Sequence, residues 1–198
     1  MIGIDYEKAD LNIRSLFAFQ PSASLEGMQV LKNKYGLDGI VIISTCNRTE
    51  VYVSAKEEVK DLFALVCSLK KIDSEKYEKY VVERQNQDAI HHLFQLACGM
   101  KSKVFGEDQI ITQVKTALLQ AREVETTDAY LEKVFQGAIT AAKKIKSQVH
   151  LTAVKASVIE EMKKVLQEHK KSLEGCKCLV IGNGEIGRLA ATAMIAEK

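Results

Sequence analysis

The sequence predicts an α/β protein: an N-terminal α+β sandwich, a helical bundle, a linker helix and the first β-α unit of a truncated further domain. Three observations predict this order. Apolar β-branched runs flank residues 44–50, apolar residues recur at helical spacing from Asp88 onward, and a glycine-rich turn follows an apolar run near Gly182. We therefore expect one domain at 1–150 (parts 1–85 and 86–150), a linker helix at 151–174 and the truncated unit at 175–198.

Strands and helices alternate in residues 1–85, which is typical of an α/β sandwich. A helix after Pro21, capped by Ser22 or Ser24, is expected to end at Gly36, because glycine suits a left-handed cap. Amphipathic spacing predicts another helix. The other expected elements are a strand at 1–4, a short helical or irregular segment at 11–19, two strands flanking residues 44–50, a helix at 57–71 and a strand at 77–82.

Residues 88–149 carry three apolar stripes at helical spacing and predict a helical bundle. Gly99 is expected to end the first helix, Gly106 precedes the second, and Thr127 and Asp128 cap the third. A fourth stripe from Val154 to Leu166 predicts the linker helix.

Composition is that of an ordinary globular protein. A net charge of +2 does not indicate a nucleic-acid binder, and no apolar run approaches the roughly 20 residues that span a bilayer. The start of the chain lacks the layout of a signal peptide, so a cytoplasmic location and no membrane association are expected. The five cysteines form no zinc or disulfide pattern and predict reduced thiols without a metal.

The segment from Ser44 to Glu50 is the main candidate for chemistry. It places Cys46 and Arg48 in a tight loop between two strands, where functional residues are often found. A thiol attacks as the thiolate, and a cation such as Arg48 would lower its pKa; alternatively, Arg48 would grip a substrate carboxylate. Composition alone favours another interpretation, in which Cys46 is a small buried residue at a strand end, because reactive cysteines are a minority.

A second candidate is the glycine-rich turn in the last 25 residues. The apolar run 176–181 predicts a buried strand, and a helical pattern follows the turn directly. In this context the glycines predict a dinucleotide fingerprint of the Rossmann type, and an ordinary β-turn-α crossover is the alternative. The fingerprint residues are Gly182, Asn183, Gly184, Glu185, Ile186 and Gly187.

Two motifs resemble one enzyme family. The segment Ser44-Thr45-Cys46-Asn47-Arg48-Thr49-Glu50 resembles the signature of glutamyl-tRNA reductase, the first enzyme of tetrapyrrole synthesis from glutamate. The spacing of His92-Leu93-Phe94, Ser102, Gly106-Glu107, Gln109-Ile110 and Gln113-Val114-Lys115 is similar to the family's second signature. The glycine-rich turn falls where that family begins its NADPH domain.

The resemblance implies an NADPH-dependent oxidoreductase that reduces glutamyl-tRNA(Glu) to glutamate-1-semialdehyde. Cys46 resembles the nucleophile that forms a glutamyl thioester, and His92 resembles a histidine needed for activity near the ester. From its position alone, His92 is expected to be a surface or boundary residue. The resemblance further implies substrate contacts at Thr45, Asn47, Arg48, Ser102, Glu107, Asp108, Gln109 and Gln113.

The resemblance also implies a homodimer formed through C-terminal helices absent from this chain, and a downstream aminomutase as a possible partner. We expect the 198 residues to be a fragment without complete reductase activity, because only the start of the NADPH domain is present.

Several positions depart from the family pattern. Tyr6 to Asp10 replace a usual His-Lys-Thr-Ala-Pro run, and Lys101 replaces an acidic residue. The departures motivate one further hypothesis, and a third also stays open. The chain would be a reductase-like paralogue that binds or regulates in tetrapyrrole synthesis, or an unrelated dehydrogenase with an ordinary cysteine near its substrate.

Overall fold

A computed structural model describes residues 1–149, 155–169, 176–182 and 184–195. The chain divides into two compact units, Met1–His150 and Leu151–Lys198. Among the described residues, no helix combines the length and the apolar character needed to cross a bilayer.

The first unit is built on a four-stranded sheet, in which each paired strand runs antiparallel to its neighbour. Its order is β2-β3-β1-β4, and the register of the central hairpin pairs Ile43 with Glu50 and Ser44 with Thr49. The predicted hairpin around residues 44–50 is therefore confirmed. The strands are β1 (Ile2–Asp5), β2 (Gly39–Ser44), β3 (Arg48–Ser54) and β4 (Val82–Glu83).

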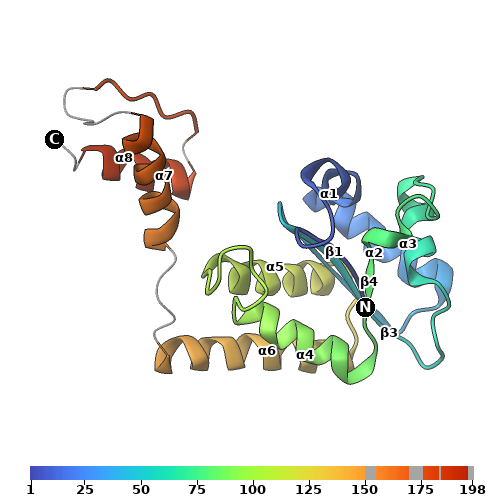
Figure 1. The fold of residues 1–198 in the computed structure, drawn as a ribbon. Helices are drawn as coiled ribbons and strands as arrows, with labels where there is room; N and C mark the ends of the chain where they lie inside the picture. The colour runs from blue at the N-terminus through green and yellow to red at the C-terminus, as the bar shows by residue number, and fades with distance from the viewer. Residues whose placement is uncertain (150–154, 170–175, 183, 196–198) are drawn as a thin grey trace. The chain divides into compact units, whose positions relative to one another are not determined.

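Helices cover both faces of this sheet. Figure 1 shows α2 and α3 on one side of the sheet and α4, α5 and α6 on the other. Helix α5 also runs along the edge strand β2 and contacts α2. The helices of this unit are α1 (Leu11–Phe17), α2 (Pro21–Tyr35), α3 (Leu62–Lys70), α4 (Asn86–Ala97), α5 (Gln109–Glu123) and α6 (Ala129–Gln148), with a 3-10 turn at Glu78–Tyr80.

The core lies between the sheet and these helices. Met28 of α2, Leu93 of α4 and Phe135 of α6 are completely or almost completely buried. The ring of Phe135 meets that of Tyr52 from β3 edge to face, with centroids 5.3 Å apart. The apolar stripes of the helical region thus form the core of the first unit, as their spacing predicts.

Helix ends follow the predicted caps in two cases. Gly36 ends α2 in the left-handed conformation with φ 63°, and Asp128 caps α6 by accepting a hydrogen bond from the Leu131 amide at 2.8 Å. The cap expected from Ser22 or Ser24 is wrong: Gln20 occupies that position and Pro21 is the first helical residue. Proline suits the first position because its missing N–H has no helical partner there.

Two other boundaries differ from the prediction. The helix expected over 57–71 begins only at Leu62, because Asp61 caps it by accepting a hydrogen bond from the Ala64 amide at 2.8 Å. The strand expected over 77–82 is a 3-10 turn followed by the two-residue β4. Only that end of the segment reaches β1 to form ladder hydrogen bonds.

The second unit contains α7 (Lys155–His169) and α8 (Glu185–Ile195). Helix α7 confirms the helix that the stripe from Val154 to Leu166 predicts, although Val154 itself lies outside the described residues. The buried strand expected at 176–181 is wrong, since these residues are exposed and form no strand. A strand needs a neighbour for its backbone hydrogen bonds, and the described residues of this unit supply none.

Candidate active site

The β2–β3 hairpin presents Cys46 at its tip. The Thr45 amide donates to the Arg48 carbonyl at 2.8 Å, and the Thr45 hydroxyl accepts from the amides of Asn47 and Arg48, each at 3.2 Å. Cys46 itself is exposed, so its interpretation as a buried strand-end residue is wrong. The Arg14 Nε donates to the Cys46 carbonyl at 3.2 Å, which ties α1 to the tip.

A cluster of polar residues lies buried directly behind this tip. Arg48, Glu50 and Tyr52 alternate along β3 and therefore share one face of the sheet. The Arg48 Nη1 lies 2.7 Å from Glu50 Oε1, and the Tyr52 hydroxyl donates to Glu50 Oε2 at 2.6 Å. From α4, the His92 Nε2 lies 3.0 Å from Glu50 Oε1. We call these four residues the Glu50 cluster.

His92 is only 4% exposed, so its assignment as a surface or boundary residue is wrong. The spacing of apolar residues could not predict this burial, because the cost of burying the histidine is offset by its polar partner, Glu50. An ionised carboxylate can only accept hydrogen bonds, so the Nε2 of His92 carries the proton toward Glu50. The other ring nitrogen, Nδ1, has no hydrogen-bond partner among the described residues.

The Glu50 cluster shifts the pKa values of Glu50 and Tyr52. Burial alone raises the pKa of Glu50, but the hydrogen bond and charge of His92, the charge of Arg48 and the Tyr52 hydrogen bond outweigh it, and the pKa is about 2. Burial and the Glu50 charge raise the pKa of Tyr52 well above its usual value. At neutral pH the cluster therefore contains a carboxylate that accepts hydrogen bonds from three side chains.

This lowered pKa predicts acid sensitivity. Glu50 titrates near 4.5 when unfolded and near 2 when folded, so its stabilising contribution is complete above pH 4.5 and disappears as pH falls toward 2. We expect the free energy of unfolding to fall by about 3 kcal/mol over this interval. Urea titrations at successive pH values measure it. The same profile in Glu50→Gln as in the wild type would contradict the assignment.

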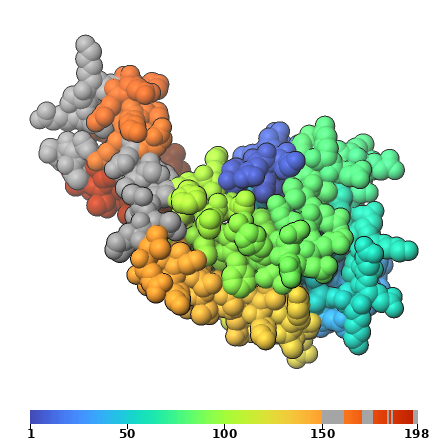
Figure 2. Space-filling model, turned by 60° about the horizontal axis from the view of Figure 1, so that its bottom comes forward, coloured from blue at the N-terminus to red at the C-terminus, as the bar shows by residue number. Residues whose placement is uncertain are grey.

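The loop after α4 holds the opposite side of Arg48. The Arg48 Nη2 donates to the Lys101 carbonyl, and the Tyr6 hydroxyl donates to the Ser102 carbonyl at 3.3 Å. The Tyr6 ring lies 5.9 Å from the guanidinium carbon of Arg48. In Figure 2 the N-terminal segment (blue) lies at the surface beside the segment that follows α4 (yellow-green). Arg48 is 2% exposed as a result.

The remaining predicted substrate residues lie on this loop and on α5. Ser102 is buried, and its hydroxyl has no hydrogen-bond partner among the described residues. The Lys146 Nζ donates to the Glu107 carbonyl at 3.1 Å and to Asp108 Oδ1 at 2.9 Å. Gln109 begins α5, and Gln113 lies one turn later on the same helix. Gln113 and Ser44 line the same cavity. The structure thus brings Thr45 and Ser102 close to the Glu50 cluster, to which Arg48 and His92 belong. Gln113 lies on the β2 side.

The other described thiols differ from Cys46. Cys67 and Cys98 are buried, and burial raises the pKa of both, that of Cys67 to about 11. Such thiols are poor nucleophiles. Cys176 and Cys178 are exposed but belong to the second unit. Nowhere in the described part of the chain do three His, Cys, Asp or Glu side chains gather as metal ligands would.

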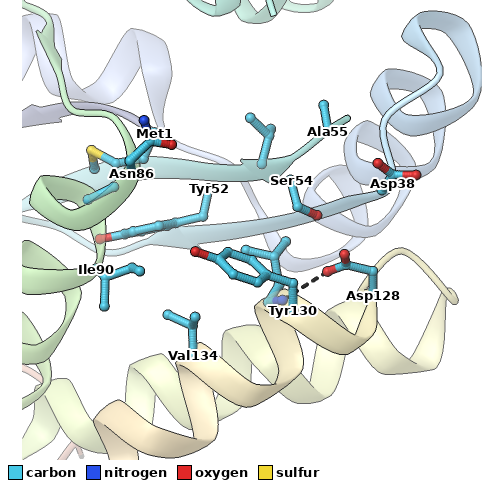
Figure 3. A pocket seen from close by; sticks show the side chains of 13 residues that line it. Met1, Asp38, Tyr52, Ser54, Ala55, Asn86, Ile90, Asp128, Tyr130 and Val134 are labelled. Carbon is cyan, nitrogen blue, oxygen red and sulfur yellow. Dashed lines mark hydrogen bonds between the residues drawn. The ribbon is translucent and has the colours of Figure 1, made fainter. Parts of the chain in front are cut away.

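A cavity of about 320 Å³ lies at the far end of β3 (Figure 3). Tyr52 and Ser54 of the sheet, Asn86 of α4 and Asp128 and Tyr130 at the start of α6 line it. None of its described lining residues belongs to the predicted site. Tyr52 forms a wall of this cavity while its hydroxyl reaches back to Glu50, so the ring separates the two regions.

The glycine-rich turn in the second unit lies directly before α8, but no strand precedes it among the described residues, so the strand-turn-helix context of the predicted fingerprint is not shown. Gly182 adopts φ 113°, and a Cβ on Gly187 would lie 2.6 Å from the Gly182 carbonyl oxygen, so only glycine fits at 187. Among the described residues other than its chain neighbours, no atom lies within 4 Å of a Cβ built on Gly184, so the backbone there faces open space. Helix α8 begins at the next residue and directs its amides toward this space. Asn183 lies outside the described residues.

Comparison with known proteins decides the family. Residues 2–149 match the sequence model of the family described as glutamyl-tRNAGlu reductase, N-terminal domain. The chain belongs to the glutamyl-tRNA reductase family. The matched residues comprise almost all of the first unit, including the hairpin and the Glu50 cluster.

Individual reductases agree with this assignment. The chain is 41% identical to the glutamyl-tRNA reductase of Alkaliphilus oremlandii and 44% identical to that of Acetivibrio thermocellus, with 98% of this chain and 58% of each relative covered. It is 38% identical over 97% of its length to a probable multifunctional siroheme biosynthesis protein HemA of Ruminiclostridium josui, of which it covers 38%. The chain therefore spans 58% or less of the length of each of these relatives.

A solved structure shows the same fold. The glutamyl-tRNA reductase from Methanopyrus kandleri superposes with a TM-score of 0.70 and 28% identity, covering 99% of this chain and 46% of that one. The mixed α/β architecture is thus the reductase architecture.

Sequence reasoning missed several residues that shape the candidate site. Glu50 and Tyr52 were identifiable, because their period-two spacing from Arg48 puts all three on one face of a strand. Tyr6 carries no such signal, since it reaches the site from 96 residues away in sequence. Lys101 contributes through its backbone carbonyl, which side-chain patterns do not reveal.

Proposed function

We propose that the chain is the N-terminal catalytic part of a glutamyl-tRNA reductase, in which Cys46 accepts the glutamyl group from glutamyl-tRNA(Glu). The observation that carries this proposal is an exposed thiol at the tip of a hairpin whose base is locked by the buried Glu50 cluster. Rigid support of an exposed nucleophile is what covalent catalysis requires.

In the proposed step, the Cys46 sulfur attacks the carbonyl carbon of the ester that joins glutamate to the terminal ribose. A carbon–sulfur bond forms, the ester carbon–oxygen bond breaks, and the thiol proton ends on the ribose oxygen. The products are a glutamyl thioester on Cys46 and free tRNA. Neither an oxidant nor a reductant is needed for this half of the reaction.

Neighbouring groups have distinct roles in this proposal. Thr45 and Asn47 shape the tip, and the buried Arg48 supports it from behind through Glu50 and the Lys101 carbonyl. His92 acts through Glu50, to which its Nε2 is bound. Ser102, Glu107, Asp108 and Gln109 supply hydrogen bonds and charge for the glutamyl group and its ester, and Gln113 contacts the substrate from the β2 side.

NADPH is the proposed cofactor, held at the glycine-rich turn. It would supply the hydride that converts the glutamyl thioester into glutamate-1-semialdehyde for tetrapyrrole synthesis. The turn supports this because Gly184 is open to a close approach and Gly187 admits no side chain. The same proposal includes a homodimeric longer protein, an aminomutase that consumes the aldehyde, and a cytoplasmic location, where a catalytic thiol stays reduced.

Mass spectrometry of the chain mixed with glutamyl-tRNA tests the proposed first step. We expect a glutamyl increment that peptide mapping places on Cys46 and that is absent in Cys46→Ser. Circular dichroism of the variant verifies that its fold is unchanged. A folded wild-type chain that gives no increment would overturn the proposal, and tRNA binding without an increment would indicate a binding or regulatory paralogue.

A further inference from the structure

A cavity of about 240 Å³ lies between α2, the edge strand β2 and α5. We propose that this cavity is the subsite for the terminal adenosine of the charged tRNA. The inference rests on the proposed function, because it identifies where the leaving nucleoside of that reaction lies. The cavity is called the β2-edge cavity below.

Its position relative to the thiol is fixed by chain geometry. Ser44 lines the β2-edge cavity and precedes Cys46 by two residues. A chain advances at most about 3.5 Å per residue, so the backbones of these two residues are within about 7 Å of each other. The ester that Cys46 attacks is carried by the ribose of the terminal nucleotide, so the β2-edge cavity is close enough to Cys46 to receive that nucleoside.

The lining of the β2-edge cavity selects between the two parts of the substrate. No described residue that lines it carries a charge; it has apolar walls at Phe19 and Ile42 and hydroxyl or amide groups at Ser24, Gln113, Thr116 and Gln120. A glutamyl ammonium and carboxylate buried there would lack charged partners, which is costly. Adenosine has an apolar base face, polar edges and no charge, and it matches this lining.

Ser24 supplies an independent indication that a polar ligand completes the site. Its side chain is 3% exposed and lines the β2-edge cavity, yet its Oγ has no hydrogen-bond partner among the described residues. A buried hydroxyl left in this state costs about 1–3 kcal/mol. The N-terminus of α2 has no side-chain cap, because Gln20 makes no such hydrogen bond. The backbone amides of the first turn therefore point out of the end of the helix at which Ser24 lies. A ribose hydroxyl or a base nitrogen would satisfy Ser24.

The first experiment compares two glutamyl donors in single-turnover acylation of Cys46. One donor is 3′-O-glutamyl-adenosine, and the other is a glutamyl thioester of N-acetylcysteamine, which lacks a nucleoside. Ser24→Ala should slow acylation by the adenosine ester about five- to tenfold at subsaturating donor, as loss of one hydrogen bond predicts. Acylation by the thioester should be unchanged. A merely structural role of Ser24 would alter both donors equally.

The second experiment uses the absence of tryptophan from the chain. Thr116→Trp places a single indole at the exposed rim of the β2-edge cavity, so the fold does not depend on a buried substitution. Leu119→Trp is the matched control, because Leu119 is exposed on the same helix but lines a different surface. Adenosine monophosphate should change the fluorescence of the first variant and leave the second unchanged.

The outcomes separate this inference from the proposed function. Cys46 acylation that is insensitive to Ser24→Ala, together with unresponsive Thr116→Trp fluorescence, would overturn the subsite and leave the proposed function intact. A fluorescence response to free glutamate in place of adenosine monophosphate would assign the β2-edge cavity to the glutamyl group and also overturn the inference. Failure of both donors on the wild-type chain would remove the proposed function itself.

Discussion

Replacing Glu50 with alanine should lower the free energy of unfolding of the first unit by about 3–5 kcal/mol, the usual cost of breaking a buried ion pair. Glu50 is 1% exposed, and its two oxygens accept hydrogen bonds from Arg48, His92 and Tyr52. Removing the carboxylate would leave the Arg48 guanidinium, which is 2% exposed, without its counter-charge. The variant should also lose the well-ordered hairpin tip that carries Cys46.

Tyrosine fluorescence measures this change selectively, because all six tyrosines lie in the first unit and the chain has no tryptophan. Urea titration of Glu132→Ala is the matched control. Glu132 pairs with Arg122 at a half-exposed position, so its loss should cost no more than about 1 kcal/mol. A Glu50→Ala variant no less stable than Glu132→Ala would show that the Glu50 cluster contributes little to the fold.

Gly99→Ala should destabilise the first unit by about 2–4 kcal/mol. Gly99 has φ +81°, where an alanine side chain is strained, and its Cβ would lie 3.0 Å from the Glu107 carbonyl oxygen and 3.0 Å from the Gly106 carbonyl carbon. Both neighbours are backbone atoms that cannot rotate away. The resulting shift should move the loop whose carbonyl groups hold Arg48 and Tyr6.

Gly36→Ala separates these two contributions. Gly36 also has positive φ, at +63°, but no described atom beyond its chain neighbours lies within 4 Å of its added Cβ. It should cost only about 1 kcal/mol, the conformational part alone. Urea titration compares the two variants, and hydrogen exchange of the Gly106 amide, which donates to the Gly99 carbonyl, reports on the loop. Equal losses in both variants would exclude crowding at Gly99.

The order of the elements was predictable because helix and strand periods are local properties of the sequence. The β-branched runs around residues 44–50 gave the hairpin, and glycines at 36 and 99 marked helix ends. Errors occurred where a strand lacks a neighbour to pair with, as at 176–181, and where a single polar contact decides a boundary. Asp61 delays α3 by accepting from the Ala64 amide, and no periodicity in the surrounding residues reveals that hydrogen bond.

The candidate site was predictable only in part. The resemblance of two motifs supplied Cys46, His92 and the residues around Ser102, but it did not supply the partners that hold them. His92 is buried because Glu50, 42 positions earlier, accepts its hydrogen bond. The side chain of Arg14 and the carbonyl of Lys101 reach the hairpin through tertiary contacts, and spacing in one sequence does not contain such contacts.

The alternation of polar side chains along β3 has a consequence for how the hairpin pairs. A slip of one residue between β2 and β3 would turn Arg48 and Glu50 toward the opposite, apolar side of the sheet, away from His92. Each misaligned pairing would therefore bury two charges without partners. The same residues that surround the thiol thus act as a register lock, which selects the one alignment that leaves Cys46 at the turn.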